Sequence, residues 1–392
     1  MTDRRFATFS RRAVLGSTLA GAAAFSLGVT VPARQTPVTF PAETAMRDIV
    51  DTFVATSGTP GAMAAVWHGD GAPWLYAAGV GNLETQAPLT TDDAVRIASN
   101  TKTFTATVVL QLIDEGLLSL DDVVATWMPD IPNGDTATIR NLLGMTAGIF
   151  NWIEAPGIEA AWIADPLMPW TPEEAIDIAR ENPPYFAPGE GFHYAETNYF
   201  LLGVIAEAVT STPIDVLITE RLLTPNSLTR TSFPTTPAMP EPYSRGYVPD
   251  PSGGTPLDLT LSNPDFPWTA GAMISTLDDM LVWARLLTSG TLISPELQAE
   301  RLQLTTISTS PFVLGYGLGI FTIAGYWGHN GGINGYSTYM VHNPETDTTI
   351  VTATNLSTNQ GGGADQIFLA LAALIDPALI PAASPVASPA PQ

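Results

Sequence analysis

The sequence predicts an α+β protein in which one antiparallel sheet of about five core strands is built from both ends of the chain, with flanking helices and an inserted, mostly helical subdomain. Two observations support this prediction. Near the N-terminal end, Asp70-Gly71 separates two apolar runs, which is a strong hairpin signal. Strand-like runs return only after residue 312, beyond a helix-rich middle. One shared sheet is the economical way to bury both sets of strands.

The predicted domain covers 41–376, with a sheet part at about 41–98 and 270–376 and a helical insert at about 99–269. The Thr171-Pro-Glu-Glu174 segment is a clear helix start, with a capping Thr and a Glu three residues later. Residues 224–270 are rich in Pro, Ser and Thr and predict a long surface connection. The elements expected in chain order are a helix over 43–57, hairpin strands over 61–67 and 73–79, a helix from 99 to about 116, helices over 137–145, 171–180, 197–210, 213–223, 276–287 and 295–304, strands over 312–321, 322–328, 335–342 and 348–355, and a helix over 365–375.

Composition excludes several classes of function. The formal net charge of −23 argues against nucleic acid or an anionic membrane surface as a partner. The absence of cysteine excludes disulfides, thiolate zinc sites and a cysteine nucleophile. Four scattered histidines without a His-Glu-x-x-His motif argue against a catalytic metal, and no Gly-x-Ser-x-Gly elbow supports an α/β-hydrolase. We therefore expect no cofactor and no metal, and a small-molecule or peptide substrate.

The two ends of the chain are expected to lie outside the fold. Residues 1–33 resemble a twin-arginine export signal, with Arg11-Arg12 before an apolar run and a small-residue cleavage site near Ala33. The alternative is an uncleaved single-span anchor. In both cases the globular part is expected to be exported, to the periplasm, the cell surface or the medium. Residues 377–392 form a Pro/Ala/Ser-rich tail that cannot build a core.

The chain has one lysine, Lys102, and it stands three residues after Ser99 at the start of a predicted helix. Positions i and i+3 share a helix face, so the hydroxyl and the amine can meet. A desolvated lysine can take the proton of a serine, whereas an arginine cannot lose its own proton near neutrality. The alternative is a surface lysine with Ser99 as a helix cap. By itself this spacing favours neither interpretation.

Two further segments carry candidate site residues. Tyr194 lies in a turn immediately before a predicted helix, where its phenol could relay protons, although an ordinary buried tyrosine is the better interpretation of that position alone. Gly328-His-Asn-Gly-Gly-Ile-Asn-Gly335 reads as a Gly-rich bend entering a strand. Its glycines let a ligand approach the backbone closely, and His329 can change its charge near neutrality. The alternative there is a β-turn with a solvent-facing histidine.

The order of these three motifs, Ser99-x-x-Lys102, then the Tyr194 motif, then His329-x-Gly331, resembles the penicillin-recognising serine acyltransferases. The resemblance is to the serine β-lactamase-related branch that holds class C β-lactamases, D-alanyl-D-alanine carboxypeptidases, D-aminopeptidases and related esterases. Further segments that resemble this branch are Leu142–Ile149, Pro188-Gly189, Asn198–Gly203, Ala270–Thr276 and Tyr316–Gly319. The resemblance covers about residues 43–375 and implies the β-lactamase/transpeptidase-like fold.

The resemblance also implies roles for individual residues. Ser99 would be the nucleophile, Lys102 its base and Tyr194 a proton relay. On the substrate side, His329 would hold the place of the Lys or His of the third motif. Gly331 and Gly332 would also lie on the substrate side. The backbone N–H groups of Ser99 and Gly332 would together form an oxyanion hole.

Two departures from the family pattern affect this expectation. Glu196 stands where an Asn is usual, two residues after Tyr194, and we expect it in the cleft near Lys102, where a carboxylate would hold the lysine charged. A protonated Glu196 would instead donate like an amide, and a Glu196 that only caps its helix would not enter the cleft. Met145 holds the place of a family His, and there we expect packing.

The charge pattern bears on the substrate. No Lys or Arg follows Arg301, so His329 and His342 are the only candidate cations on the late-strand side of the cleft. We therefore expect a secreted serine hydrolase that forms an acyl-enzyme on Ser99 and cleaves an ester, an amide or a D-amino-acid peptide bond. The alternatives are a strict D-Ala-D-Ala carboxypeptidase and a domain that binds β-lactams or wall peptides without turnover.

Overall fold

The fold was analysed on a computed structural model that describes residues 43–308, 314–357 and 363–377. These residues all belong to the unit that spans Phe40–Gln392. The predicted export signal (1–33) and all but the first residue of the predicted tail (378–392) lie outside the described residues, so both stay predictions.

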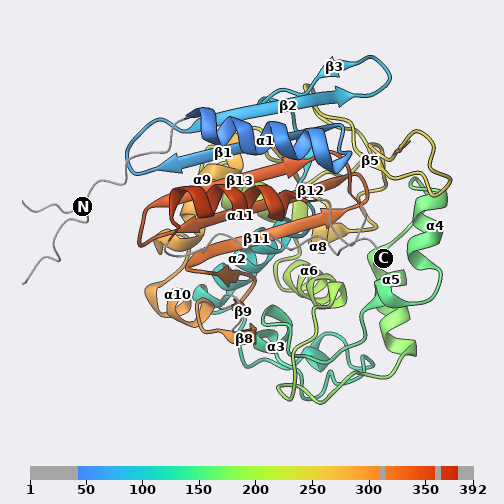
Figure 1. The fold of residues 1–392 in the computed structure, drawn as a ribbon. Coiled ribbons are helices and arrows are strands. Elements are labelled where there is room, and N and C mark those ends of the chain that lie inside the picture. Colours follow the sequence, from blue (N-terminus) through green and yellow to red (C-terminus); the bar gives the residue numbers. More distant parts are fainter. Residues whose placement is uncertain (1–42, 309–313, 358–362, 378–392) are drawn as a thin grey trace, which may run out of the picture. The chain divides into compact units, whose positions relative to one another are not determined.

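One antiparallel sheet dominates the fold, with the strand order β3-β2-β1-β13-β12-β11-β10-β9-β8 (Figure 1). Its five long central strands are β2 (Trp74–Asn82), β1 (Gly61–His68), β13 (Thr348–Thr354), β12 (Tyr336–Asn343) and β11 (Tyr326–Ile333). The early hairpin meets the late strands where β1 pairs with β13, in a register that sets Ala62 opposite Thr354. The prediction of a sheet of about five core strands built from both chain ends is confirmed. Four short strands extend it at its edges: β3 (Ala87–Pro88), β10 (Phe321–Ile323), β9 (Leu314–Tyr316) and β8 (Thr305–Ser308).

Helices cover both faces of the sheet. The terminal helices α1 (Glu43–Ser57) and α11 (Ala364–Ile375) lie side by side over one face, as predicted (Figure 1). Helix α9 (Leu277–Ser289) packs on the other face against β1, β12 and β13. Behind it lies α2 (Thr101–Asp114), joined to α9 by the stacked rings of Phe104 and Trp283, whose centroids are 4.0 Å apart. Strands β12 and β13 are buried on both faces as a result and have no exposed residue.

The inserted part is mostly helical and borders the β11 side of the sheet (Figure 1). Its caps follow the sequence signals: Thr171 and Glu174 form the predicted capping box at α5, and Thr138 forms another with Asn141 at α3. Arg96 explains how the long connection over 224–270 is attached, because its buried guanidinium donates to the carbonyls of Pro237, Thr260 and Ser262.

The elements not yet given are η1 (Ala98–Asn100), η2 (Val124–Thr126), α3 (Ile139–Leu143), η3 (Trp152–Glu154), α4 (Ile158–Ala164), α5 (Pro172–Glu181), α6 (Glu196–Thr210), α7 (Ile214–Ile218), the π-helical turn η4 (Thr219–Leu223), α8 (Trp268–Gly271), α10 (Pro295–Arg301) and the strand pairs β4 (Val95–Arg96) with β7 (Ile274–Ser275) and β5 (Tyr247–Val248) with β6 (Leu257–Asp258).

Three local predictions are wrong. Ser99 does not start the α-helix but lies in the preceding 3₁₀ turn η1. The Gly-rich segment 328–335 is not a bend: most of it belongs to strand β11, because it pairs with β12 from Gly328 to Ile333. The two strands expected over 312–328 are instead the short β9 and β10 and the first residues of β11, with 309–313 outside the described residues.

Over the described residues, no single helix is both long enough and apolar enough to cross a membrane. Helix α6 reaches that length and composition only together with the segment Ile214–Leu223, from which it is bent by 85°.

Gly319 brings the β9–β10 connection against helix α2. Its φ is +74°, and an added Cβ would lie 2.2 Å from Cβ of Ala106 on α2 and 2.9 Å from the hydroxyl of Tyr199. Both the left-handed backbone and the close approach therefore require glycine here.

We predict that Gly319→Ala lowers the free energy of unfolding well beyond the cost of left-handed backbone, which is about 1–2 kcal/mol, because overpacking adds about 1–3 kcal/mol. Gly116→Ala is the matched control: its φ is +72°, and nothing lies within 4 Å of the added Cβ. Urea unfolding of both variants measures the difference. An equal decrease in the free energy of unfolding in the two variants would show that the contact of Gly319 with α2 is not tight.

Candidate active site

Ser99 lies on a short, tied turn between β4 and α2. The residue before it, Ala98, has a φ of +49°, a left-handed backbone that a non-glycine residue adopts only at a cost. The neighbouring Asn100 holds this turn, because its Nδ2 donates to the carbonyl of Ile97 (3.0 Å) and to Oγ1 of Thr338 on β12 (2.8 Å). The serine is thus fixed against the sheet rather than carried on a free helix end.

Lys102 is fully buried one turn later, and its amine points at Ser99. Its Nζ donates to Oγ of Ser99 (3.0 Å), to Oε2 of Glu196 (2.5 Å) and to the carbonyl of Ala270 (2.9 Å). Burial lowers the pKa of Lys102 below its ordinary value, and the attraction of the Glu196 carboxylate opposes this shift. The structure therefore contradicts the alternative of a surface lysine.

Glu196 is the first residue of α6, and its side chain, 22% exposed, contacts Lys102 and lines the cleft. The N–H of Glu196 donates to Oδ1 of Asn151 (3.0 Å), which holds the start of the helix in place. The structure thus places Glu196 where the sequence analysis expected it. The alternative, in which Glu196 stays at its helix end and never enters the cleft, is wrong.

Tyr194 lies in the turn before α6, with Nζ of Lys102 at 4.8 Å from the centre of its ring. Burial raises the pKa of Tyr194 well above 10, the Glu196 charge raises it further, and a hydrogen bond with Ser99 opposes the shift. Tyr194 is therefore a neutral phenol next to the nucleophile. Such a group can pass a proton on, but it is not a phenolate base.

Strand β11 passes the turn that leads to Ser99 at close range because Gly331 has no side chain. A Cβ at Gly331 would lie 2.3 Å from the carbonyl of Ile97 and 3.0 Å from Cβ of Ala98. Gly332 follows, opposite Ser337 in the β11–β12 ladder, and lines the cleft together with Ser99. The backbones of Ser99 and Gly332 thus border the same space, which is what an oxyanion hole requires.

His329 does not supply the cation that the sequence analysis expected on this side. It is 1% exposed, and burial together with the repulsion of Lys102 lowers its pKa to about 3. Its Nδ1–H donates to the carbonyl of Asn330 (2.6 Å), so Nε2 accepts from the hydroxyl of Tyr316 (3.0 Å). His342 is buried on β12, and burial lowers its pKa to about 4. Neither imidazole is charged near neutrality, so the expected change of His329 between pH 5 and 8 is wrong.

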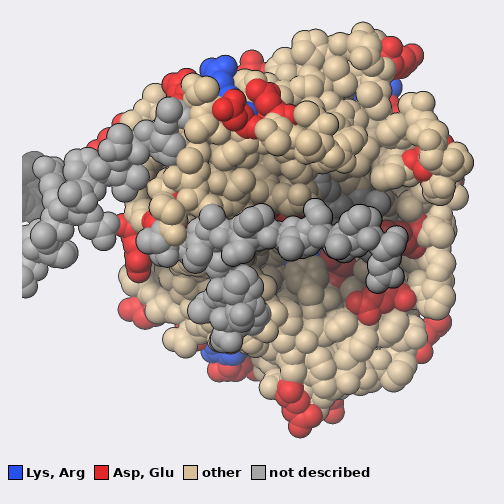
Figure 2. Space-filling view, viewed as in Figure 1, with Lys and Arg blue, Asp and Glu red and all other residues tan. Residues whose placement is uncertain are grey.

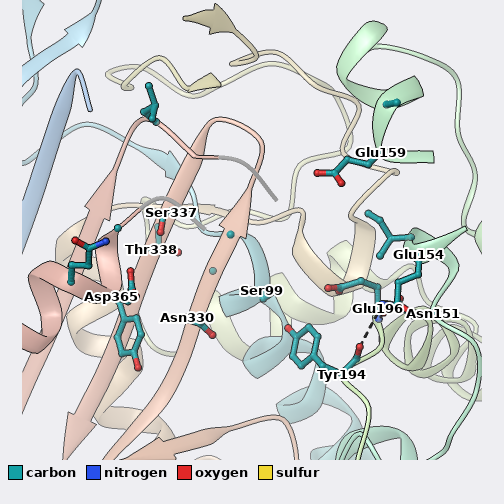
Figure 3. A pocket seen from close by; sticks show the side chains of 18 of the residues that line it. Ser99, Asn151, Glu154, Glu159, Tyr194, Glu196, Asn330, Ser337, Thr338 and Asp365 are labelled. Atoms are coloured by element: carbon teal, nitrogen blue, oxygen red, sulfur yellow. Dashed lines mark hydrogen bonds between the residues drawn. The ribbon is translucent and has the colours of Figure 1, made fainter. Parts of the chain in front are cut away.

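The cleft in front of Ser99 has a volume of about 1260 Å³ and an acidic lining. Glu154, Glu159 and Asp365 border it together with Glu196, and no described residue that lines it is Lys or Arg. Figure 3 shows Glu154 and Glu159 on one side of Ser99 and Asp365 on the other. In Figure 2, acidic side chains gather around the hollow at the right of the view.

Glu154 has the most fixed carboxylate of the acidic rim. It accepts hydrogen bonds from Nδ2 of Asn151 (3.0 Å), the hydroxyl of Tyr185 (2.6 Å) and Nε2 of His193 (2.9 Å). Burial alone would raise the pKa of Glu154, but these hydrogen bonds outweigh it and hold the pKa below its usual value. Glu154 is therefore an oriented anion facing the cleft.

Sequence reasoning missed several residues of this site. Asn151, Glu154 and Ala270 reach it only through tertiary packing; Ala270 belongs to a segment that resembles the family, but nothing in the sequence assigns its carbonyl to Lys102. Met145, where packing was expected, is buried, and its sulfur accepts from the N–H of Ala195 (3.4 Å) in the Tyr194 turn. Over the residues that the structure describes, no group of three or more His, Cys, Asp or Glu side chains could hold a metal ion.

Comparisons with known proteins agree with this geometry. The family described as Beta-lactamase matches residues 46–374. A D-stereospecific amidohydrolase from Streptomyces sp. superposes with a TM-score of 0.76 at 32% identity, over 84% of this chain and 98% of that one. A D-amino acid amidase from Ochrobactrum anthropi SV3 has the same fold, with a TM-score of 0.76 at 24% identity, over 86% of this chain and 98% of that one.

Two bacterial proteins are also similar in sequence. Protein flp of Staphylococcus aureus (strain COL) is 30% identical over 275 residues, which cover 67% of this chain and 52% of that protein. The putative penicillin-binding protein PbpX of Bacillus subtilis (strain 168) is 28% identical, over 67% of this chain and 62% of that protein. The matched region is thus about half of the length of the first of these relatives.

We predict that Glu196→Gln moves the rising limb of the pH–rate profile to lower pH and increases activity at neutral pH. The Glu196 carboxylate raises the pKa of Lys102 against the effect of burial. Without that charge, Lys102 loses its proton at lower pH and is available as a base. The measurement is kcat/KM from pH 5 to pH 10 on any ester or amide that the protein turns over.

The control is Glu159→Gln, which removes a carboxylate that lines the same cleft and lies apart from Glu196 (Figure 3). The rising limb of the pH–rate profile of Glu159→Gln should stay close to that of the wild type. A Glu196→Gln protein with native circular dichroism and an unshifted limb would show that this ion pair does not set the ionisation that the profile reports.

Proposed function

Since the chain belongs to the Beta-lactamase family, we propose that it is a serine hydrolase that forms an acyl-enzyme on Ser99 and cleaves an ester, an amide or a D-amino-acid peptide bond. The observation that carries the proposal is the contact of the buried Lys102 amine with both Ser99 and Glu196 at the floor of an open cleft. A nucleophile, a base with a lowered pKa and a neutral phenol then lie within one site.

The proposed reaction proceeds in two steps. Oγ of Ser99 attacks the carbonyl carbon, and its proton goes to the unprotonated amine of Lys102. The bond to the leaving nitrogen or oxygen breaks, and that atom takes a proton through Tyr194. A water molecule then attacks the acyl carbon of the ester to Ser99 and gives up a proton by the same route. The bond between that carbon and Oγ of Ser99 breaks, Oγ takes up this proton, and the acid is released. The oxyanion of each tetrahedral intermediate would be stabilised by the N–H groups of Ser99 and Gly332.

The charge of the cleft supports a substrate with a protonated amine. Glu154 is held in place by three donors, and Glu159 lies on the same side of Ser99 (Figure 3). The relative at 32% identity is described as a D-stereospecific amidohydrolase, which supports an amide of a D-amino acid. A free carboxylate on the substrate would meet several like charges and no described Lys or Arg in the lining, which disfavours a strict D-Ala-D-Ala carboxypeptidase.

The location of the protein is part of the same proposal. The twin-arginine-type segment 1–33 supports export, with cleavage near Ala33 or retention by an uncleaved anchor. A domain that only binds β-lactams or wall peptides is the competing function. Trapped, non-hydrolysed adducts on Ser99 with every acyl donor would favour it.

We predict that a fluorophosphonate labels Ser99 alone, and that Lys102→Arg abolishes most turnover while the protein still folds. Arginine keeps the charge but cannot give up its proton, so kcat should fall by at least about 10³-fold. Intact mass with peptide mapping locates the label, and steady-state kinetics on p-nitrophenyl esters measures the loss. Arg221→Lys, on a partly exposed ion pair with Glu115, is the control exchange and should be silent. Label on another serine, or full turnover in Lys102→Arg, would contradict the assignment.

We also predict that D-phenylalaninamide with a free amine is hydrolysed faster than its N-acetyl form, by about tenfold or more. The oriented carboxylate of Glu154 should attract the ammonium group, so Glu154→Gln should raise KM for the free amine and leave KM for the acetylated form unchanged. Asp70→Asn removes an exposed charge in the β1–β2 turn and serves as the control. An equal rise in KM for the two substrates in Glu154→Gln would contradict the proposal that Glu154 recognises the charge of the ammonium group.

A further inference from the structure

A second hollow, of about 320 Å³, opens beside the catalytic tyrosine. It shares Tyr194, Asn330, Tyr339 and Asp365 with the lining of the main cleft, so the two spaces adjoin each other. Its remaining lining is largely apolar and includes Phe192, Ile307, Leu314, Phe321, Ile323 and Leu369. Ile307 is 41% exposed, one of the few large apolar side chains with so much exposed surface among the described residues. The protein thus keeps an apolar surface open to water directly next to its site.

The position of this hollow relative to Ser99 indicates which part of a substrate would enter it. A separate, much smaller space on the Glu196 side of the serine is lined by Ser99, Gly332 and Ile333, with aromatic rings behind them, and Tyr194 is not part of its lining. The 320 Å³ hollow is lined by Tyr194 but not by Ser99. In the proposed reaction Tyr194 hands its proton to the leaving atom. The group attached to that atom therefore extends into the hollow on the Tyr194 side.

The charges around the hollow exclude an anionic group. His329 is neutral near pH 7, and no described residue of the lining is Lys or Arg. Asp365 is exposed at the rim, in the first turn of α11. Its carboxylate already matches the positive end of that helix, so the helix end offers no net attraction to a second anion. A carboxylate entering here would lose water and gain no cation.

We propose that this hollow is a leaving-group pocket that binds an uncharged, apolar leaving group and rejects one with a free carboxylate. The chemical class is an amine or alcohol that carries a branched or aromatic side chain, such as an amidated amino acid. The proposal rests on the proposed function: the bond that forms joins Ser99 Oγ to the acyl carbon, the bond that breaks frees the leaving amine, and Tyr194 supplies its proton. The pocket adds selection to that step by removing apolar surface of the leaving group from water.

The test uses one small acyl group with different leaving groups: D-alanyl-glycinamide, D-alanyl-leucinamide and D-alanyl-leucine with its free carboxylate. We expect kcat/KM for the leucinamide to exceed that for the glycinamide by about 10- to 100-fold, since a buried leucine side chain is favoured by that factor. We expect the free acid to be slower than the leucinamide by about tenfold or more. Release of the leaving group is followed by chromatography on the full-length protein.

Two variants test the two parts of the pocket separately. Ile323→Ala should reduce the preference for leucinamide over glycinamide, because it removes apolar lining. Asp365→Asn should reduce the preference for the amide over the free acid and leave the first preference unchanged. Leu167→Ala and Asp70→Asn are the matched controls, because Leu167 is 52% exposed outside the pocket lining and Asp70 is exposed in the β1–β2 turn. Both preferences should be unchanged in the controls.

The outcomes separate this inference from the function on which it rests. Acylation of Ser99 at equal rates by leucinamide and glycinamide substrates would overturn the leaving-group pocket and leave the serine hydrolase intact. Equal rates for the acid and the amide would overturn the exclusion of anions. A folded protein whose Ser99 is acylated by none of these substrates, nor by esters, would overturn the proposed function and this pocket with it.

Discussion

The buried amine of Lys102 joins three parts of the chain that are far apart in sequence. It bonds to the turn that holds Ser99, to the first residue of α6 and to the carbonyl of Ala270 in α8. A cation without partners cannot be buried at such a position, because its desolvation would have no compensation. The nucleophile turn, α6 and α8 must therefore assemble together. The same three contacts that make the burial tolerable also place the base against its serine.

Around this amine, the site combines groups whose pKa values burial has shifted in different directions. Tyr194 and His329 are both neutral, the first because burial raises its pKa and the second because burial lowers its pKa to about 3. Glu154 and Asp365 at the rim of the cleft are instead exposed. On the proposed function, proton transfer takes place among the buried groups and charge recognition at the exposed rim.

The features that depend on local spacing could be predicted from the sequence. The Asp70-Gly71 turn predicted the early hairpin, and the Thr171 capping box predicted α5. The i, i+3 spacing of Ser99 and Lys102 predicted their contact. The order of the elements placed the late strands in the same sheet as the hairpin, because one shared sheet is the economical way to bury both sets of strands, and the resemblance of three motifs to one family implied the same fold. These predictions needed only local rules and the order of the motifs.

The features that depend on long-range packing could not be predicted. The Gly-rich segment has poor strand propensity and is a strand because β12 pairs with it from Gly328 to Ile333. His329 was expected to carry charge, and only the packing of Tyr316 and Phe321 around it shows that it does not. Asn151 lies in a segment with no motif, and its role follows only from the fold.

Asn151 has a consequence for how such a protein could be changed. One side chain holds two acidic residues of the site: Oδ1 accepts from the backbone N–H of Glu196, and Nδ2 donates to the carboxylate of Glu154. On the proposed function, Glu154 meets the substrate and Glu196 meets the base. Substrate recognition and catalysis therefore both depend on the position of this one side chain, so neither can be changed independently of the other. Redesign of the rim for another substrate would have to keep this amide in place, because moving it would also displace the residue that holds the catalytic lysine.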